Sequence, residues 1–355
     1  MKCHVPYNNI EIHQNGDVYT CCPAWNNYYK IGNIFEHSIE EIWNGKEIIA
    51  LREKIIHGDY SLCNKDTCFI YKNKEFYLID KYKIDTICKA YPKYITLGYD
   101  YECNIACKIC RAHVELLSDE DIEKLNDKIE SFFLPMLKEC KILKINAAGD
   151  PFASRHSKLL LKKAIQNYPD LKLDIITNGI LCNEKIFNEI GLTPEKIINF
   201  SVSLHASNKK TYGKMVKNGE KFFDIIINNI KWLSEISKNK FPLYLNFVVT
   251  AENYRDLPSF VKLAKKYNTN MYIWEYRRQQ NHSENPRHEE LDITDKNHKE
   301  YKNLIKILNE PLLIANKKSF CSILLDIQKE YNQLPLSDKI KLKWKNLIYK
   351  FNKNV

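Results

Sequence analysis

The chain has 355 residues, with 54 Lys and Arg against 44 Asp and Glu, and it contains 12 Cys. This length leaves room for two domains, or for one large domain with an attached module, and 44% hydrophobic residues can build a core. The composition excludes a disordered chain and a collagen-like repeat. Because no run of about 18 apolar residues occurs, we expect no membrane span and no membrane partner.

The cysteines are the compositional feature that most needs an explanation. The first eight residues have no apolar stretch of a secretion signal, so we expect a cytoplasmic protein, whose reducing surroundings leave thiols available to metals. The formal charge of +10 is spread over amphipathic Lys-bearing segments and not over a dense Arg block. We therefore do not expect nucleic acid as a partner.

Residues 1 to about 85 carry five cysteines and begin with a predicted hairpin. The turn Asn15-Gly16-Asp17 stands between two short alternating stretches, and Asn and Gly accept the positive φ that a hairpin turn needs. Ser38 and Glu41 then form a capping box, and apolar residues recur at helical spacing as far as residue 50. This segment therefore predicts a hairpin followed by one helix.

Six strand-like runs, each followed by a helical pattern, extend over residues 93–280. The runs are almost continuously apolar, which indicates a parallel sheet buried on both faces. Six are too few for a closed eight-stranded barrel, so the predicted fold is α/β, a partial (β/α)6 barrel of the TIM type with its function at the carboxyl ends of the strands. The predicted strands are 94–99, 141–147, 172–177, 197–204, 243–250 and 271–276, and the predicted helices are 119–139, 157–168, 184–191, 221–238 and 256–267.

Three cysteines follow the first of these strands in the spacing C-x3-C-x2-C: Cys103, Cys107 and Cys110. On one short loop, three thiolates can hold three corners of a cubic 4Fe–4S cluster and leave one iron open to a small molecule. The alternative is a structural zinc site, although a closed zinc site needs a fourth ligand and more often uses paired C-x2-C spacings. The place of the motif at a strand end favours the cluster.

This loop at the end of the first strand of a βα series resembles the radical S-adenosylmethionine superfamily, and the likeness extends over about residues 93–280. The resemblance implies that the open iron binds the amino and carboxylate groups of S-adenosylmethionine. It implies that one electron from the cluster cleaves the sulfonium and that the 5'-deoxyadenosyl radical so formed abstracts hydrogen from a substrate. An electron donor such as flavodoxin or ferredoxin is then the expected partner.

The resemblance also assigns roles to residues at the later strand ends. Gly149 lets the backbone approach a ligand closely and Asp150 supplies an acceptor for an ammonium group, where the family usually has Gly-Gly-Glu-Pro. An ordinary turn, and polar groups satisfied within the protein, are the alternatives. The predicted cofactor-binding residues are Ala148, Gly149, Asp150, Asn178, Ser201, Ser203 and Asn246. The predicted catalytic residues, which would touch cofactor or substrate, are His205, Glu275, Tyr276 and Arg277.

The cysteines before the barrel resemble the SPASM or twitch module of the same superfamily. Gly16 and Cys21 fit a G-x4-C element, and Cys63 and Cys68 follow the capped helix. The resemblance implies that Cys3, Cys21, Cys63 and Cys68 hold one auxiliary 4Fe–4S cluster and that Cys22 is a spare. The usual module follows the barrel, whereas this one precedes it. A zinc site on the same four cysteines, or a cluster with an open iron, are the alternatives, but four thiolates close a cluster and suit electron transfer.

These predictions combine into one hypothesis of function. The chain is expected to be an enzyme that forms a 5'-deoxyadenosyl radical and acts on a small-molecule or carbohydrate-derived substrate, since no leader-peptide-binding domain is evident. The alternatives are a peptide or protein maturase and a non-catalytic zinc protein. The predicted domains are an auxiliary-cluster module at 1–85, the core at 93–280 and a helical extension at 281–355. The remaining cysteines are expected to be small buried hydrophobes: Cys88, Cys140, Cys182 and Cys321.

Overall fold

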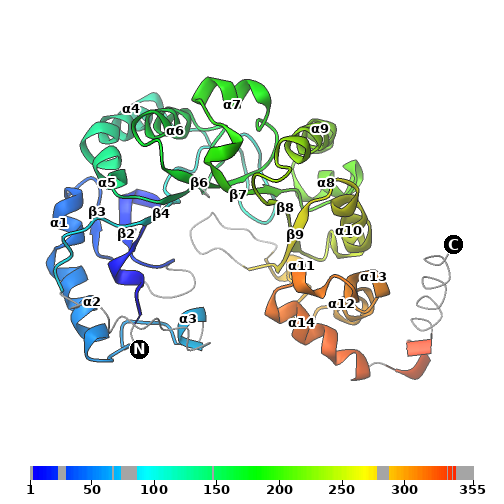
Figure 1. Cartoon of the computed structure of the whole chain (residues 1–355). Helices are drawn as coiled ribbons and strands as arrows, with labels where there is room; N and C mark the ends of the chain where they lie inside the picture. The colour runs from blue at the N-terminus through cyan, green and yellow to red at the C-terminus, as the bar shows by residue number, and fades with distance from the viewer. Residues whose placement is uncertain are drawn as a thin grey trace. The chain divides into compact units, whose positions relative to one another are not determined.

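The computed structural model describes residues 3–22, 29–65, 68–72, 86–145, 148–277, 288–333, 335–337 and 339–340. The chain divides into two compact units (Figure 1). Unit 1 comprises Met1–Asn104, Glu115–Ile176 and Glu184–Ile198, and unit 2 comprises Ile105–Val114, Thr177–Asn183 and Asn199–Val355. The last two residues of the predicted strand 141–147 and the chain beyond residue 340 lie outside the described residues.

Unit 1 is built on strands in the order β3-β2-β1-β4-β5-β6. The predicted hairpin is confirmed: β1 and β2 are antiparallel, and Asn15 and Gly16 between them have φ values of 59° and 78°. The predicted strands of the βα series are also confirmed, and β4, β5 and β6 are parallel. The bounds are β1 Asn9–Ile12, β2 Asp17–Tyr19, β3 Gly32–Asn33, β4 Tyr94–Leu97, β5 Ile142–Ile145 and β6 Lys172–Thr177.

The N-terminal hairpin joins the βα series edge to edge, which the sequence did not predict. Strand β1 pairs in parallel with β4, and Ile10 lies beside Ile95. Both residues are buried, so the apolar face of β4 continues without interruption onto the hairpin. The cysteine-bearing segment is therefore bound through backbone hydrogen bonds to the strand that precedes Cys103.

The helices of unit 1 follow the predictions with two breaks. The capping box of Ser38 and Glu41 is present, but the helix stops at Trp43 because the chain turns at Gly45, where an added Cβ would lie 2.3 Å from the Glu41 carbonyl oxygen. The second break is a π-helical turn before Pro135, which lacks the N–H that a continuous helix needs. The helices are α1 Ile39–Trp43, α2 Lys46–Ile56, α3 Phe69–Lys72, α4 Asp119–Lys128, α5 Leu134–Leu137, α6 Arg155–Asn167 and α7 Glu184–Ile190.

The sheet of unit 1 has one apolar and one more polar face. Alternate residues of β4, β5 and β6 are buried aliphatic side chains, and α4, α5 and α6 lie on one side of these strands (Figure 1). The intervening residues are more exposed and include Thr96, Lys144 and Asp174. The polar face is thus the side on which the strands offer chemistry.

Unit 2 carries the parallel strands β7 Ile197–Ser203, β8 Leu243–Val249 and β9 Asn270–Glu275, in that order. Together with β4, β5 and β6 they confirm the predicted α/β class with parallel strands and helices in alternation. The predicted C-terminal helices are confirmed for the part of residues 281–355 that the structure describes. The helices are α8 Lys209–Met215, α9 Glu220–Ile236, α10 Leu257–Lys266, α11 His288–Leu291, α12 Tyr301–Leu308, α13 Pro311–Ile314 and α14 Ser322–Lys329.

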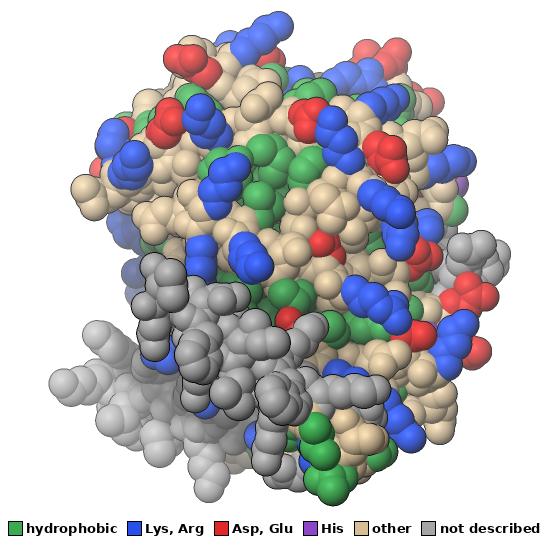
Figure 2. All heavy atoms as spheres, turned by 90° about the vertical axis from the view of Figure 1, so that its right-hand side faces the viewer, with side chains coloured by type: hydrophobic (Ala, Val, Ile, Leu, Met, Phe, Trp, Pro, Cys, Tyr) green, Lys and Arg blue, Asp and Glu red, His purple; other side chains and the backbone are tan. Residues whose placement is uncertain are grey.

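Two observations on the structure agree with what the composition predicts. On the face drawn in Figure 2, Lys and Arg side chains are scattered among Asp and Glu side chains and do not gather into one patch. No helix among the described residues is long and apolar enough to cross a membrane.

Candidate functional site

Four cysteines of unit 1 converge on one small cavity of about 40 Å³. They come from the start of the chain, the end of the β1–β2 hairpin and the turns before and at the start of α3. Apolar side chains, including Leu51 and Ile55 of α2, complete its walls. The cysteines are those predicted to hold the auxiliary cluster: Cys3, Cys21, Cys63 and Cys68.

The electrostatics of this cavity favour a bound cation. Burial, together with the negative charges of neighbouring thiolates, raises the pKa of Cys3 and of Cys63 to about 11. Burial also raises the pKa of Cys21, to which Cys3 and Cys63 add their charges. Thiolates crowded in an apolar cavity are unstable unless a cation neutralises them. The donor set therefore fits an iron–sulfur cluster, and its four thiolates also fit zinc.

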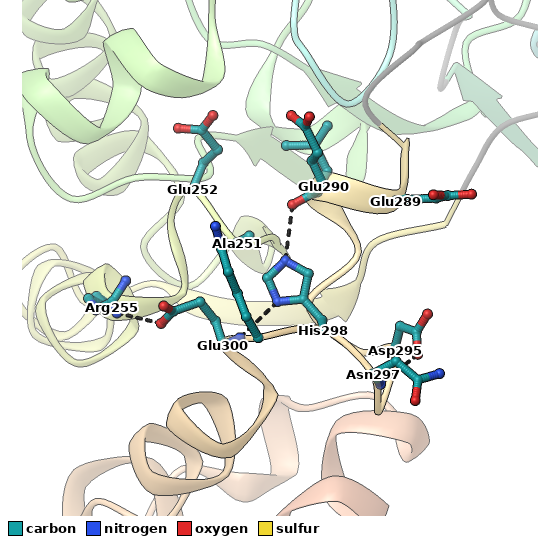
Figure 3. A pocket seen from close by; sticks show the side chains of 11 residues that line it. Ala251, Glu252, Arg255, Glu289, Glu290, Asp295, Asn297, His298 and Glu300 are labelled. Atoms are coloured by element: carbon teal, nitrogen blue, oxygen red, sulfur yellow. Dashed lines mark hydrogen bonds and ion pairs between the residues drawn. The ribbon is translucent and has the colours of Figure 1, made fainter.

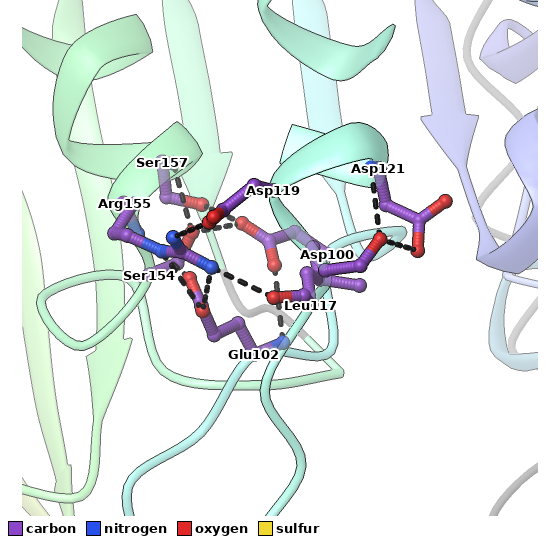
Figure 4. Close-up of polar contacts among 9 residues, drawn as sticks. Asp100, Glu102, Leu117, Asp119, Asp121, Ser154, Arg155 and Ser157 are labelled. Carbon is purple, nitrogen blue, oxygen red and sulfur yellow. Dashed lines mark hydrogen bonds and ion pairs between the residues drawn. The ribbon is translucent and has the colours of Figure 1, made fainter. Parts of the chain in front are cut away.

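The loop that follows β4 is fixed by a buried polar network (Figure 4). Asp100 accepts hydrogen bonds from the hydroxyls of Ser154 and Ser157, the latter at 2.6 Å. The buried Glu102 accepts from the backbone N–H of Arg155 at 2.9 Å and from its guanidinium at 3.2 Å. Since Glu102 directly precedes Cys103, the network sets where the first cysteine of the C-x3-C-x2-C motif lies.

The segment after β5 is held against the same loop. The backbone N–H groups of Gly149 and Asp150 donate to the carbonyls of Asp100 and Glu102, each at 2.9 Å. The Asp150 carboxylate is buried, and one of its oxygens accepts the backbone N–H of Phe152 at 3.1 Å. Ala148 is half-buried beside them. The role of these residues toward S-adenosylmethionine stays a prediction.

Replacing Gly149 with Ala tests this close approach. A Cβ at Gly149 would lie 2.2 Å from the Glu102 carbonyl oxygen, so we expect Gly149→Ala to lower the free energy of unfolding by ~2–3 kcal/mol. The control is Gly58→Ala, where φ is positive but no atom lies within 4 Å, with an expected loss of about 1 kcal/mol. Urea unfolding measures both, and equal losses would count against the backbone contact.

In unit 2, two backbone hydrogen bonds hold the middle of the cysteine loop. The N–H of Lys108 donates to the carbonyl of Met215 at 2.8 Å, and the N–H of Lys217 donates to the carbonyl of Ala106 at 3.1 Å. Cys107 lies between the two bonds and pairs with the segment after α8 as a short bridge. This loop is therefore anchored at its centre as well as at its start.

Two basic side chains of the cysteine loop, Lys108 and Arg111, make polar contacts. The Arg111 guanidinium donates to Cys110 Sγ at 3.6 Å, and the Lys108 ammonium lies 3.2 Å from a Glu252 oxygen. Arg111 thus holds the Cys110 side chain in place through a hydrogen bond.

Asn178 lies in the turn after β6. Its Oδ1 accepts the backbone N–H of Ile180 at 3.0 Å, and the turn passes through Gly179 at a φ of 86°. A Cβ at Gly179 would lie 2.7 Å from Val202, so the turn packs closely on β7. The Asn229 side chain donates to the Gly179 carbonyl at 2.8 Å and fixes the turn.

The structure brings two predicted cofactor residues together on β7 and β8. Ser203 and Asn246 are cross-strand neighbours, and Ser201 pairs in the same way with Tyr244. The Oδ1 atom of Asn246 is buried and has no hydrogen-bond partner among the described residues. An orphaned buried acceptor is costly, so this position fits a ligand that donates a hydrogen bond, as a ribose hydroxyl or an ammonium does.

His205 is buried at the end of β7 with a φ of 57°. The backbone N–H of Val248 donates to its Nδ1 at 3.1 Å, which assigns the ring proton to Nε2. Burial lowers the pKa of His205 to about 4, so the ring is neutral near pH 7. A strained, buried and neutral histidine at a strand end agrees with a functional role, which stays a prediction.

This histidine gives the protein a defined response to acid. Since its folded pKa of about 4 lies below its ordinary value of 6.5, its contribution to stability is complete above pH 6.5 and is lost as the pH falls toward 4. Asn tolerates a positive φ, so His205→Asn should fold. Between pH 6.5 and 4, this substitution should reduce the change of unfolding free energy with pH by up to about 1.4 kcal/mol per pH unit. Burial lowers the pKa of His156 to about 4 as well, so His156 should still make the unfolding free energy of the variant depend on pH in this window. An unchanged slope would contradict the assignment.

Of the three residues predicted at the end of β9, Glu275 and Tyr276 are buried and Arg277 is exposed. Glu275 lies on the face of β9 that carries Met271 and Ile273, and it forms an ion pair with Arg277. Burial, and then a hydrogen bond to Glu275, raise the pKa of the Cys321 thiol to about 12. Tyr276 is also buried. Their contact with a substrate stays a prediction.

The four remaining cysteines follow the expectation only in part. Cys140 and Cys182 are buried, as predicted. The prediction was wrong for Cys88 and Cys321, which are only partly buried. Cys88 lies in a polar turn where its N–H donates to Asn44, and Cys321 begins helix α14, so neither is inside an apolar core.

A larger cavity of about 670 Å³ lies in unit 2, between the loop after β8 and the segment from α11 to α12 (Figure 3). None of the predicted site residues lines it. Its carboxylates include Glu252, which pairs with Lys108, and Glu300, which pairs with Arg255 at 2.5 Å. These pairs connect the C-terminal helices and the cysteine loop to the β8 end, which is a structural role.

Sequence reasoning missed the residues that hold the site in place. Asp100 and Glu102 stand immediately before Cys103, and two acids beside a metal-ligating motif are a usable signal. Asn253 and Asn229 bind backbone carbonyls at 3.0 Å and 2.8 Å and carry no local sequence signal. Only the fold reveals them.

Comparison with known families bears on the N-terminal segment. Residues 3–69 match the family model of SPASM, described as an iron–sulfur cluster-binding domain. This range contains all four cysteines of the small cavity. The prediction of a module of this kind ahead of the βα series is confirmed.

Comparison with curated proteins finds a probable GTP 3',8-cyclase of Saccharolobus islandicus, 29% identical over 174 residues, covering 47% of this chain and 51% of the relative. It also finds the tungsten-containing aldehyde ferredoxin oxidoreductase cofactor-modifying protein of Pyrococcus furiosus, 25% identical over 179 residues, covering 48% and 47%. The chain spans about half the length of the curated relatives that it matches. Among solved structures, Streptococcus suis SuiB is similar over 82% of this chain and 69% of its own, with 14% identity and a TM-score of 0.42.

Proposed function

We propose that the chain is an enzyme of the radical S-adenosylmethionine superfamily that abstracts hydrogen from a small-molecule substrate, since a SPASM iron–sulfur domain stands ahead of its βα series. Its cofactors are 4Fe–4S clusters and S-adenosylmethionine. When bound, they supply the electron and the 5'-deoxyadenosyl radical that the reaction needs. The observation that carries the proposal is the C-x3-C-x2-C loop at the end of β4, together with the four-cysteine cavity.

The chain's own residues hold and orient these groups. The Asp100 and Glu102 network fixes Cys103, and the Arg111 guanidinium donates a hydrogen bond to Cys110. Asn246 offers its orphaned acceptor to the cofactor. The four cysteines of the N-terminal cavity hold the auxiliary cluster, which passes electrons, and a flavodoxin or ferredoxin is the proposed donor.

A row of aromatic side chains supports a substrate with a planar ring or a sugar face. Tyr244 of β8 and Tyr272 of β9 are stacked with ring centroids 4.3 Å apart, and Trp274 follows at 5.8 Å from Tyr272. Trp274 at the end of this row is 40% exposed, so its indole ring can be reached by a ligand that stacks on it. The curated relatives are named for GTP and for a modified cofactor, which also favours a small molecule.

The proposal is tested with protein that is purified and reconstituted anaerobically. We expect about eight iron per chain and 5'-deoxyadenosine after reduction with dithionite. Addition of the dialysable fraction of a cell extract should increase the amount of 5'-deoxyadenosine that is formed. If only the retained macromolecules increased it, a peptide or protein substrate would be favoured. A colourless zinc protein that leaves S-adenosylmethionine intact would overturn the proposal.

Trp274→Ala tests the aromatic row. Loss of one stacking face should weaken substrate binding by about tenfold. When the dialysable fraction is added in a limiting amount, it should therefore stimulate the formation of 5'-deoxyadenosine less in this variant. Formation of 5'-deoxyadenosine without substrate should not change. The control is Ile198→Ala, which removes an exposed apolar side chain from β7. Equal stimulation in both variants would show that the row does not contact the substrate.

A further inference from the structure

A mixed set of metal-ligating side chains lies in unit 1 outside the sites described above. Glu11, His13 and Cys22 each offer one ligand atom, and the three atoms all lie within 4.8 Å of one another. All three side chains are half-buried. Cys22 is the cysteine that the sequence left as a spare, and it is not among the residues that line the four-cysteine cavity.

The hairpin brings these residues together for a simple reason. Glu11 lies in β1 and His13 follows the last residue of β1 in an extended conformation, so the two side chains lie on one face. Tyr19 of β2 pairs with Glu11, and Cys22 follows three residues later. The Tyr19 ring packs edge-on against His13 with centroids 5.5 Å apart, which holds the imidazole in place.

The distances suit a tetrahedral metal ion. Glu11 Oε2 and His13 Nε2 are 3.2 Å apart, and the bond lengths of zinc to nitrogen and oxygen place two such ligands roughly 3.3 Å apart. A zinc-bound sulfur would lie roughly 3.6 Å from each of them. The three ligand atoms lie within 4.8 Å of one another, so the longest distance between two of them must shorten by no more than about 1.2 Å when the ion binds.

We propose that Glu11, His13 and Cys22 bind a zinc ion and leave one coordination position for an oxygen-bearing ligand. One sulfur, one nitrogen and one oxygen form a donor set of intermediate softness, which suits zinc better than magnesium or calcium. Three protein ligands are typical of zinc sites that also bind water or substrate. Glu11 lies beside Thr96 and, one strand further, Lys144, so the open position faces the polar side of the sheet.

Zinc is measured in the anaerobically reconstituted full-length protein, by elemental analysis and by X-ray absorption at the zinc edge. We expect one zinc per chain, with one sulfur neighbour at about 2.3 Å and nitrogen or oxygen neighbours at about 2.0–2.1 Å. Cys22→Ser and His13→Gln should each weaken zinc binding by at least 100-fold while the iron content stays unchanged. Cys22→His, which restores a ligand, should recover zinc without a sulfur neighbour.

The matched control is His37→Gln. His37 Nδ1 and Glu36 Oε2 form an exposed His–Glu pair, 3.9 Å apart, and this substitution should leave zinc unchanged. Zinc that persists in both site variants, or absence of zinc from the protein after addition of one equivalent, would overturn the proposal. So would loss of iron in Cys22→Ser, which would make Cys22 a cluster ligand, or four sulfur neighbours, which would place zinc in the cavity.

Discussion

Replacing Cys103, Cys107 and Cys110 together with Ala should abolish cleavage of S-adenosylmethionine and remove about four of about eight iron atoms. These three thiolates are the only protein ligands proposed for the catalytic cluster, and the proposal places S-adenosylmethionine on the iron that they would leave open. The measurements are iron content and 5'-deoxyadenosine after reduction with dithionite. We expect 5'-deoxyadenosine to fall below detection and the auxiliary cluster to remain.

The control for this variant is Cys140→Ala. Its thiol is buried and donates to the Ile142 carbonyl at 3.2 Å, so the substitution costs stability but removes no proposed ligand. Iron and cleavage should both stay near their original values. A triple variant that still cleaves S-adenosylmethionine would refute the assignment of the loop.

Replacing Cys63 and Cys68 with Ala should have the complementary effect. Iron should again fall by about half, to about four per chain, but reduction with dithionite should still produce 5'-deoxyadenosine in the absence of substrate. Stimulation by substrate should be lost, because the auxiliary cluster is proposed to pass electrons during turnover. The cavity explains why two substitutions suffice, since both residues line it and a buried cluster needs every thiolate.

The same measurements separate this outcome from a general loss of folding. Unfolding would remove all iron and all cleavage at once. If the double variant lost both, the two cysteines would belong to the catalytic site, or the module would be required for the fold. If it retained all of its iron, the four-cysteine cavity would not hold a cluster.

Much of the fold could be predicted because local signals and periodicity agree. The apolar runs located β4 to β9 to within a few residues, and Asn15-Gly16 and the Ser38 capping box located the hairpin and α1. The pairing of β1 with β4 could not be predicted. An apolar edge strand can pair with any neighbour of the same alternation, and the sequence does not say which.

The candidate site also has features that the sequence predicts and features that only the structure shows. Spacing predicted the three cysteines of the C-x3-C-x2-C loop as ligands, and the resemblance to the SPASM module implied the other four. Convergence of Cys3 with Cys63 and Cys68 depends on three segments far apart in the chain, and only the structure shows it. Glu275 was predicted from its position at a strand end, but the face on which it lies depends on the strand's exact register. The predicted domain boundaries and the roles of individual site residues stay predictions.

The most direct test of the central claim is electron paramagnetic resonance of the reduced Cys63→Ala, Cys68→Ala protein with and without S-adenosylmethionine. By the proposal, only the cluster on Cys103, Cys107 and Cys110 would remain in this variant, with one iron open. The account predicts a reduced-cluster signal that changes when S-adenosylmethionine is added. A signal that S-adenosylmethionine leaves unchanged would contradict it.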